Sequence, residues 1–187
     1  MAEIDYAELT RYAKSFTGLT PDKETLLQQA GSTIKPALPG VTDRFYTTLQ
    51  AIEKTAPFIE GRLDQLKKTH LKWLEDLFDG PYDEPYTQAM YRVGRVHVKV
   101  GLPVEFMSGG MSLILEELTT LVCQTYANDP KLCPPLLKAI NAVMGFSLLV
   151  MQQSYQLSSL SAELDRFLSI TGMSMTLFEN LASAYKK

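Results

Sequence analysis

Apolar residues recur every three or four positions along most of this 187-residue chain, a spacing that keeps them on one face of an α-helix. No stretch alternates apolar and polar residues for long enough to indicate a β-strand. Prolines and short polar turns interrupt the pattern and separate the helical segments. The sequence predicts an all-α fold with helices at about 5–15, 20–34, 41–56, 60–78, 83–100, 103–126 and 134–159, and a last amphipathic helix within 160–187.

The composition is that of an ordinary globular protein, with 45% hydrophobic and 21% charged residues. The length predicts a single domain over 1–187, with its core at about 20–159. A net charge of −3 argues against a nucleic-acid-binding surface. Residues 1–11 are too polar for a signal peptide, and the longest apolar stretch, 142–151, is too short to cross a bilayer. We therefore expect a soluble cytoplasmic protein that binds neither nucleic acid nor membrane.

Two cysteines, Cys123 and Cys133, flank a polar turn. A disulfide is one alternative, but in a reducing cytosol we expect free thiols. The chain has no Cys-x-x-Cys-His stretch, which excludes a covalently attached haem. No nucleophile–base pair, phosphate-binding loop or pair of catalytic carboxylates is present, so we expect no enzyme activity.

The only two histidines both lie on apolar helix stripes. The stripes are Leu63, Leu66, His70, Trp73 and Leu77, and Tyr86, Met90, Val93, His97 and Val100. A core-facing imidazole needs a hydrogen bond or a metal for its nitrogens. Two such helices joined by a short turn can place both rings in one apolar cleft, which suits the iron of a haem. The alternative is two unrelated core histidines bonded to backbone carbonyls. A non-haem metal is disfavoured, because two histidines without an inward carboxylate supply too few ligands.

Glycines mark two places where another group is expected to approach a helix closely. Gly94 lies one turn before His97, and Gly109-Gly110 would each cost about 1 kcal/mol against alanine inside a helix. A packed neighbouring helix is the commoner explanation, and a flat ligand is the other. The nearest approach to a basic cluster is Lys67, Lys68, Arg92, Arg95 and Lys99. Most of these are expected to be solvated, and with a haem present some would pair with its propionates.

Three segments resemble the globin-coupled sensors. The stretch from Val93 to Pro103 resembles the segment that holds their proximal histidine, with its His-x-x-x-Gly-Leu pattern at His97. The run from Leu66 through His70 to Asp83 resembles their distal helix and its turn. Asp43-Arg44-Phe45-Tyr46 resembles the helix that supplies a distal tyrosine. The resemblance implies a globin fold, a three-over-three helical sandwich with an extra N-terminal helix.

The same resemblance implies a non-covalent haem b with His97 as the proximal iron ligand. Tyr46 would then be a distal hydroxyl able to hydrogen-bond the gas ligand, with Thr69 a second polar candidate. His70 matches only some members of the family and is expected to act as the sixth ligand of the iron, with a surface or hydrogen-bonding role as the alternative. The predicted pocket comprises Phe45, Tyr46, Leu66, Thr69, His70, Trp73, Met90, Val93, His97, Val100, Leu102, Phe106 and Met107.

The leading hypothesis is a haem-based sensor of a diatomic gas: oxygen, carbon monoxide or nitric oxide. Such sensors usually pass their signal through a helical homodimer to an output domain, and we expect a homodimer here. No output domain is visible in this chain, which is either a globin-only member or a separated sensor domain. The alternatives are an electron-transfer haem protein with two histidine ligands and a cofactor-free helical interaction module.

Overall fold

The computed structural model describes residues 4–185, so the first three and last two residues of the predicted domain lie outside the described part. Within it the chain forms helices and no strand, which confirms the all-α prediction. The helices are α1 (Tyr6–Thr17), α2 (Pro21–Ile34), α3 (Leu38–Ala51), α4 (Leu63–Asp76), α5 (Glu84–Lys99), α6 (Val104–Thr125), α7 (Cys133–Thr171) and α8 (Met175–Tyr185). Two short 3-10 helices, Lys35–Ala37 and Ala56–Phe58, precede and follow α3.

The two ends of α5, which carries His97, are fixed by local signals. The Asp83 carboxylate accepts a hydrogen bond from the Tyr86 backbone N–H at 3.2 Å and so caps the first turn. At the other end Gly101 adopts φ +70°. There the Gly101 and Leu102 N–H groups donate to the Val98 and His97 carbonyls at 2.9 Å each. This Schellman motif ends the helix one turn beyond His97.

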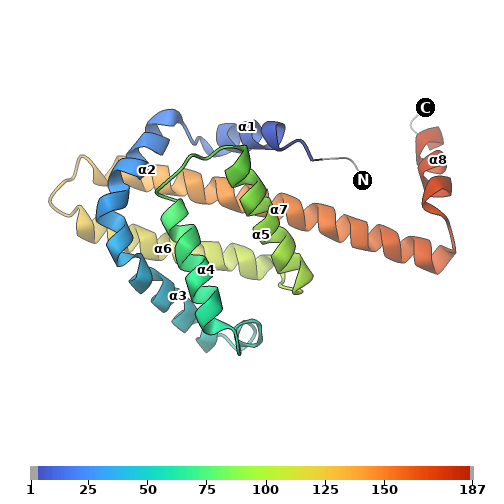
Figure 1. Cartoon of the computed structure of the whole chain (residues 1–187), viewed down its shortest axis with the longest axis horizontal. Coiled ribbons are helices and arrows are strands. Elements are labelled where there is room, and N and C mark those ends of the chain that lie inside the picture. Colours follow the sequence, from blue (N-terminus) through green and yellow to red (C-terminus); the bar gives the residue numbers. More distant parts are fainter. Residues whose placement is uncertain (1–3, 186–187) are drawn as a thin grey trace.

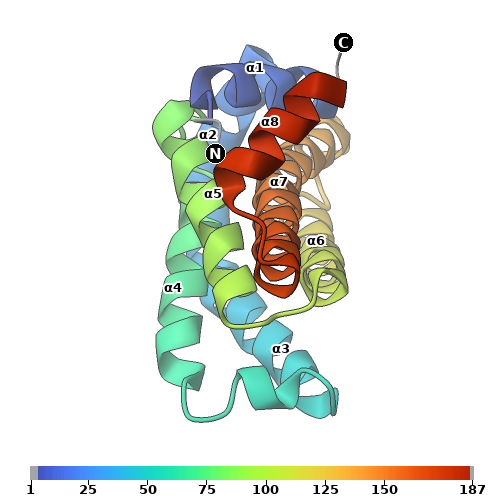
Figure 2. The same cartoon turned by 90° about the vertical axis from the view of Figure 1, so that its right-hand side faces the viewer.

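The helices form two layers with α7 at the centre (Figure 1). Helices α4 and α5 lie in one layer and α6 and α7 in the other, as the second view shows (Figure 2). Helix α3 packs on both α4 and α6 and thereby joins the layers, while α1 and α2 pack on α7. The longest helix therefore provides the surface on which most of the others are placed.

Helices α5 and α7 cross at Gly94, one turn before His97. A Cβ atom at Gly94 would lie 2.0 Å from the Ser154 hydroxyl oxygen and 2.6 Å from the Met151 carbonyl oxygen. The close approach predicted at this glycine is therefore made by a helix. At Gly110 the neighbour is the Phe45 ring, 3.6 Å from the position of a Cβ, whereas nothing lies within 4 Å at Gly109. The expectation of a close neighbour was wrong for Gly109.

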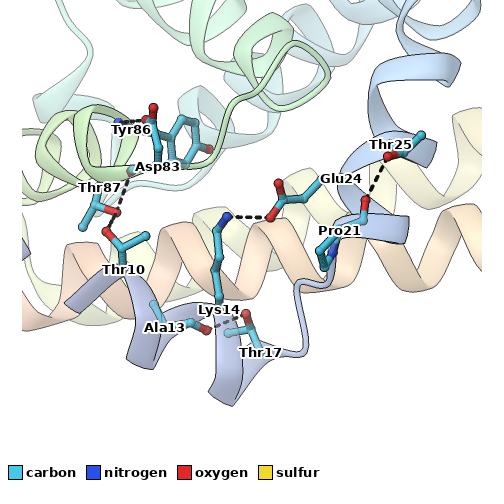
Figure 3. A network of polar contacts seen from close by, with 10 residues as sticks. All are labelled: Thr10, Ala13, Lys14, Thr17, Pro21, Glu24, Thr25, Asp83, Tyr86 and Thr87. Atoms are coloured by element: carbon cyan, nitrogen blue, oxygen red, sulfur yellow. Dashed lines mark hydrogen bonds and ion pairs between the residues drawn. The ribbon is translucent and has the colours of Figure 1, made fainter. Parts of the chain in front are cut away.

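The additional N-terminal helix, α1, is held to the body by specific contacts (Figure 3). Its Thr10 hydroxyl shares a buried 2.6 Å hydrogen bond with the Thr87 hydroxyl of α5. The Lys14 ammonium pairs with the Glu24 carboxylate of α2 at 2.6 Å. The first contact attaches α1 to α5, the helix that carries His97, and the second attaches it to α2.

The C-terminal region differs from the prediction. The sequence predicts a helix end near residue 159, but α7 continues to Thr171, and Gly172 in the left-handed conformation (φ 68°) ends it. Helix α8 therefore occupies only the last part of the predicted 160–187 helix. The end of α7 extends away from the other helices (Figure 1). Its Phe167 contacts Phe178 of α8, with ring centroids 6.2 Å apart.

Two helices, α6 and α7, are long and apolar enough to cross a membrane by length and composition alone. This corrects the expectation that the apolar stretches are too short. Half of the most apolar 18-residue window of α7 is buried within the protein. Core helices of soluble proteins have the same property, so their length and composition do not by themselves indicate a membrane protein.

Candidate functional site

A cavity of about 590 Å³ lies between α3, α4, α5 and α6, with Met151 of α7 also on its wall. This is within the size range of small-molecule and cofactor sites. Twelve of the thirteen predicted pocket residues line it: Phe45, Tyr46, Leu66, Thr69, His70, Trp73, Val93, His97, Val100, Leu102, Phe106 and Met107. Met90 does not line the cavity. Its side chain is packed within the core, so the expectation for Met90 was wrong.

Several lining residues were not predicted. Thr55, Phe58, Ile59 and Arg62 belong to the connection between α3 and α4. This connection lacks the periodicity that assigns a face to a helical residue. Other unpredicted lining residues lie within the predicted helices: Leu49, Ala89, Arg92, Val96, Gly110, Met111, Ile114 and Met151. Of these, Gly110, Met111 and Ile114 continue the helical spacing of Met107 and were accessible to sequence reasoning.

His70 is enclosed by three side chains of α3. The Thr42 hydroxyl oxygen lies 3.1 Å from His70 Nδ1. The Phe45 ring stacks on the imidazole with centroids 4.7 Å apart, and the Tyr46 ring meets its edge at 5.6 Å. These three residues are spaced three and four apart, so they share one face of α3. Trp73, one turn along α4, contacts the imidazole at 5.6 Å.

Each of the two histidines has a buried ring nitrogen without a hydrogen-bond partner among the described residues: Nε2 of His70 and Nδ1 of His97. Burial lowers the pKa of His70 from 6.5 to about 4 and also lowers the pKa of His97. Both imidazoles are therefore neutral at pH 7, the form that ligates a metal. Unsatisfied buried polar atoms are costly, and a metal ion is one partner that would satisfy them.

The remaining polar side chains on the cavity wall include hydroxyl groups and two guanidinium groups. Burial raises the pKa of Tyr46 to about 12, so its hydroxyl stays protonated, and it makes no hydrogen bond to any described residue. The Thr69 hydroxyl instead donates to the Gln65 carbonyl of its own helix at 2.9 Å. Two cationic residues, Arg62 and Arg92, also line the cavity, and the Arg62 guanidinium donates to the Phe58 carbonyl at 2.6 Å. Two cationic side chains on the wall of a largely apolar cavity are compatible with an apolar group that carries carboxylates.

A metal held by protein ligands alone has no counterpart in the fold. Between residues 4 and 185 no group of three or more His, Cys, Asp or Glu side chains converges on one point. Two imidazoles in an apolar cavity instead fit an iron whose equatorial ligands come from a porphyrin. The residues present are thus compatible with haem.

A sequence profile of the protoglobin family matches residues 6–160, which is most of the chain. The chain belongs to the protoglobin family. The match extends from α1 through the part of α7 that borders the cavity, so this protoglobin-family domain includes both histidines. A related protein is the "Heme-based aerotactic transducer HemAT" of Halobacterium salinarum, 28% identical over 102 residues. That alignment covers 53% of this chain and 21% of the transducer, so the chain matches about a fifth of that relative.

Solved globin domains share the fold of this protoglobin-family domain. The globin domain of the Geobacter sulfurreducens globin-coupled sensor superposes with a TM-score of 0.72 at 26% identity, covering 78% of this chain and 96% of that domain. The ferrous globin domain of E. coli DosC gives 0.65 at 18% identity, covering 76% and 99%, and supports the fold alone. These matches confirm the predicted globin fold and the resemblance to globin-coupled sensors.

Proposed function

We propose that this domain binds haem b and reversibly binds oxygen or another diatomic gas, and that it signals its ligand state. The observation that carries the proposal is the pair of neutral imidazoles, one from α4 and one from α5, on the wall of one apolar cavity. Membership of the protoglobin family supports it, as do the printed names of the haem-based transducer and the globin-coupled sensor. The haem, when bound, supplies the iron that takes the gas.

The residues have distinct roles in this proposal. His97 is the proximal ligand, because it follows the crossing of α5 with α7 at Gly94 and precedes the Schellman motif, so the helix around it is fixed. His70 is the sixth ligand in the absence of gas. Tyr46 donates a hydrogen bond to the gas, since its hydroxyl is protonated and has no hydrogen-bond partner among residues 4–185. Arg62 and Arg92 pair with the propionates.

The same contacts suggest how ligand state changes the protein. His70 contacts α3 through Thr42, Phe45 and Tyr46. Displacement of His70 by a gas would therefore disturb the packing of α4 on α3. A switch needs a ligand that prefers one of two such arrangements. In the proposal the long helices α6 and α7 form a homodimer and transmit the change to an output domain, and the protein acts in the cytoplasm.

Absorption spectra of the haem-loaded protein test these assignments. Purified protein mixed with hemin is expected to give a ferric spectrum of low-spin six-coordinate haem. His97→Ala should abolish or shift it, and His70→Ala should convert it to a five-coordinate or water-ligated form. A His97→Ala protein with an unchanged spectrum would refute the proximal assignment. A protein that takes up no hemin would refute the proposal as a whole.

The second candidate function is electron transfer by a haem with two histidine ligands. It is favoured by the stacked, hydrogen-bonded and therefore firmly held His70 ring. Carbon monoxide added to the ferrous protein separates the two candidates. A sensor should bind it in competition with His70, whereas an electron carrier with fixed axial ligands should keep its spectrum unchanged.

A further inference from the structure

Thr42 is unusual among the helical threonines of this chain. On the same helix, the Thr47 and Thr48 hydroxyls donate to the carbonyls of Asp43 and Arg44 at 2.9 and 3.1 Å. This bond to the preceding turn is the usual arrangement for a threonine inside a helix. Thr42, only 3% exposed, instead places its hydroxyl 3.1 Å from Nδ1 of His70 on α4. The hydroxyl is thus committed to one imidazole nitrogen.

We propose that Thr42 is a positioning residue that holds His70, whose ring lines the cavity, in the tautomer with hydrogen on Nδ1, leaving Nε2 with an unshared lone pair. The inference rests on the proposed function only for the role of that lone pair as an iron ligand. A hydroxyl can accept or donate, so the bond alone permits both tautomers. The surroundings of the second nitrogen decide between them.

Nε2 of His70 is buried and has no hydrogen-bond partner among the described residues. With hydrogen on Nε2, the protein would bury an N–H donor that has no acceptor, which is rare in folded proteins. With hydrogen on Nδ1, that N–H donates to the Thr42 oxygen, and Nε2 carries only an unshared lone pair. Metal-ligating histidines typically donate their other N–H in this way, which fixes the tautomer and raises the basicity of the ligating nitrogen.

The orientation of the ring is set separately from its tautomer. Phe45 stacks on the imidazole with planes 12° from parallel, and Tyr46 meets its edge at 83°. These rings fix the plane of the imidazole but make no distinction between its nitrogens. Within the described part of the chain, only the Thr42 hydroxyl hydrogen-bonds the imidazole, so its removal should alter the tautomer while the packing remains.

The test compares Thr42→Val, which keeps the shape and removes the hydroxyl, with Thr42→Ser, which keeps the hydroxyl. Thr47→Val is the matched control, because the Thr47 hydroxyl bonds only within its own helix. Nitrogen-15 NMR of the imidazoles in the haem-free protein at pH 7 reports the tautomer directly. We expect hydrogen on Nδ1 of His70 in the wild type, Thr42→Ser and Thr47→Val, and a shift toward hydrogen on Nε2 in Thr42→Val.

The hemin-loaded ferric proteins provide a second readout. Loss of such a hydrogen-bond partner typically weakens a ligand 10- to 100-fold. Thr42→Val should therefore lower the equilibrium constant for His70 on the iron at least about tenfold, with recovery in Thr42→Ser. Hydrogen on Nε2 in the wild type, or an unchanged tautomer in Thr42→Val, would overturn the inference. If His70→Ala leaves the ferric spectrum unchanged, the sixth-ligand proposal fails, whereas the NMR result still decides the tautomer.

Discussion

The Phe45 ring lies in contact with His70 and with the backbone of α6 near Gly110. Its stack on the His70 imidazole has a centroid separation of 4.7 Å, and a Cβ at Gly110 would touch the ring at 3.6 Å. One α3 side chain thus connects the candidate sixth ligand on α4 to the opposite layer of the sandwich. The Phe45 ring thus leaves room for a Cβ at Gly110 only in van der Waals contact with it.

A double-mutant cycle measures the interaction between Phe45 and His70. Urea unfolding of haem-free wild type, Phe45→Leu, His70→Leu and the double variant gives the four free energies of unfolding. We expect a coupling energy of about 1 kcal/mol, because stacked rings contribute about 0.5–1.5 kcal/mol beyond the area they bury. Additive effects of Phe45→Leu and His70→Leu would show that the stack contributes nothing.

Alanine substitutions at two helical glycines, Gly94 and Gly109, should change the free energy of unfolding in opposite directions. Gly94→Ala should lower the free energy of unfolding by about 3 kcal/mol, because the new methyl meets the Met151 backbone of α7 at 2.6–3.0 Å. Gly109→Ala should raise it by about 1 kcal/mol, since nothing lies within 4 Å of the added Cβ and alanine favours the helix. Denaturant unfolding of both variants at one protein concentration measures the difference. A destabilised Gly109→Ala would contradict an open environment at that position.

The helices and most of the cavity-lining residues could be predicted from the sequence because apolar residues repeat at helical spacing. The spacing of Leu66, His70 and Trp73 defines one face of α4, and that face borders the cavity. Met90 was assigned to the stripe of His97, but Ala89 and Val93 line the cavity, so the cavity-facing side of α5 passes beside Met90, which packs in the core. Phe58 and Ile59 were missed because the connection between α3 and α4 has no period from which to infer a direction.

The sequence analysis also misplaced the end of α7 and did not identify the role of Thr42. The pattern of α7 weakens near residue 159, where the helix leaves the core, yet nothing in the backbone stops it before Gly172. The role of Thr42 depends on a residue in another helix, and no local pattern encodes it. Sequence periodicity therefore indicates which residues face the core, whereas a pairing between helices requires the fold.

The haem-free protein should lose stability as pH falls from about 6.5 to about 4. Burial lowers the pKa of His70 to about 4 and that of His97 below its usual value. In this window the unfolded chain binds protons that the folded protein does not, so acidification favours unfolding. The slope is about 1.4 kcal/mol per pH unit for each such proton. Carboxylates titrate in the same range, so the measurement is the difference between wild type and His70→Leu. Equal slopes for the two proteins would show that His70 does not resist protonation.

The thiols of Cys123 and Cys133 do not line the cavity, and they support a separate prediction. Cys123 lies near the end of α6 and Cys133 is the first residue of α7. Their thiols share a weak hydrogen bond, with Sγ atoms 3.9 Å apart and no disulfide between them. A disulfide has an S–S length of about 2 Å, so closure requires a small movement of the turn between the helices.

Exposure to glutathione disulfide should therefore oxidise the pair without adding glutathione. A first thiolate forms a mixed disulfide and releases one glutathione thiol, and the second thiol displaces the other glutathione. Mass spectrometry should show the loss of two hydrogens, and closure of this short loop should raise the free energy of unfolding by about 2–3 kcal/mol. The Cys123→Ser variant should instead retain one glutathione on Cys133. Because desolvation and the hydrogen bond with Cys123 raise the pKa of the Cys133 thiol, the reaction should accelerate with rising pH. Two glutathione adducts on the wild type, or disulfide-linked dimers, would show that the turn does not bring the two sulfurs together.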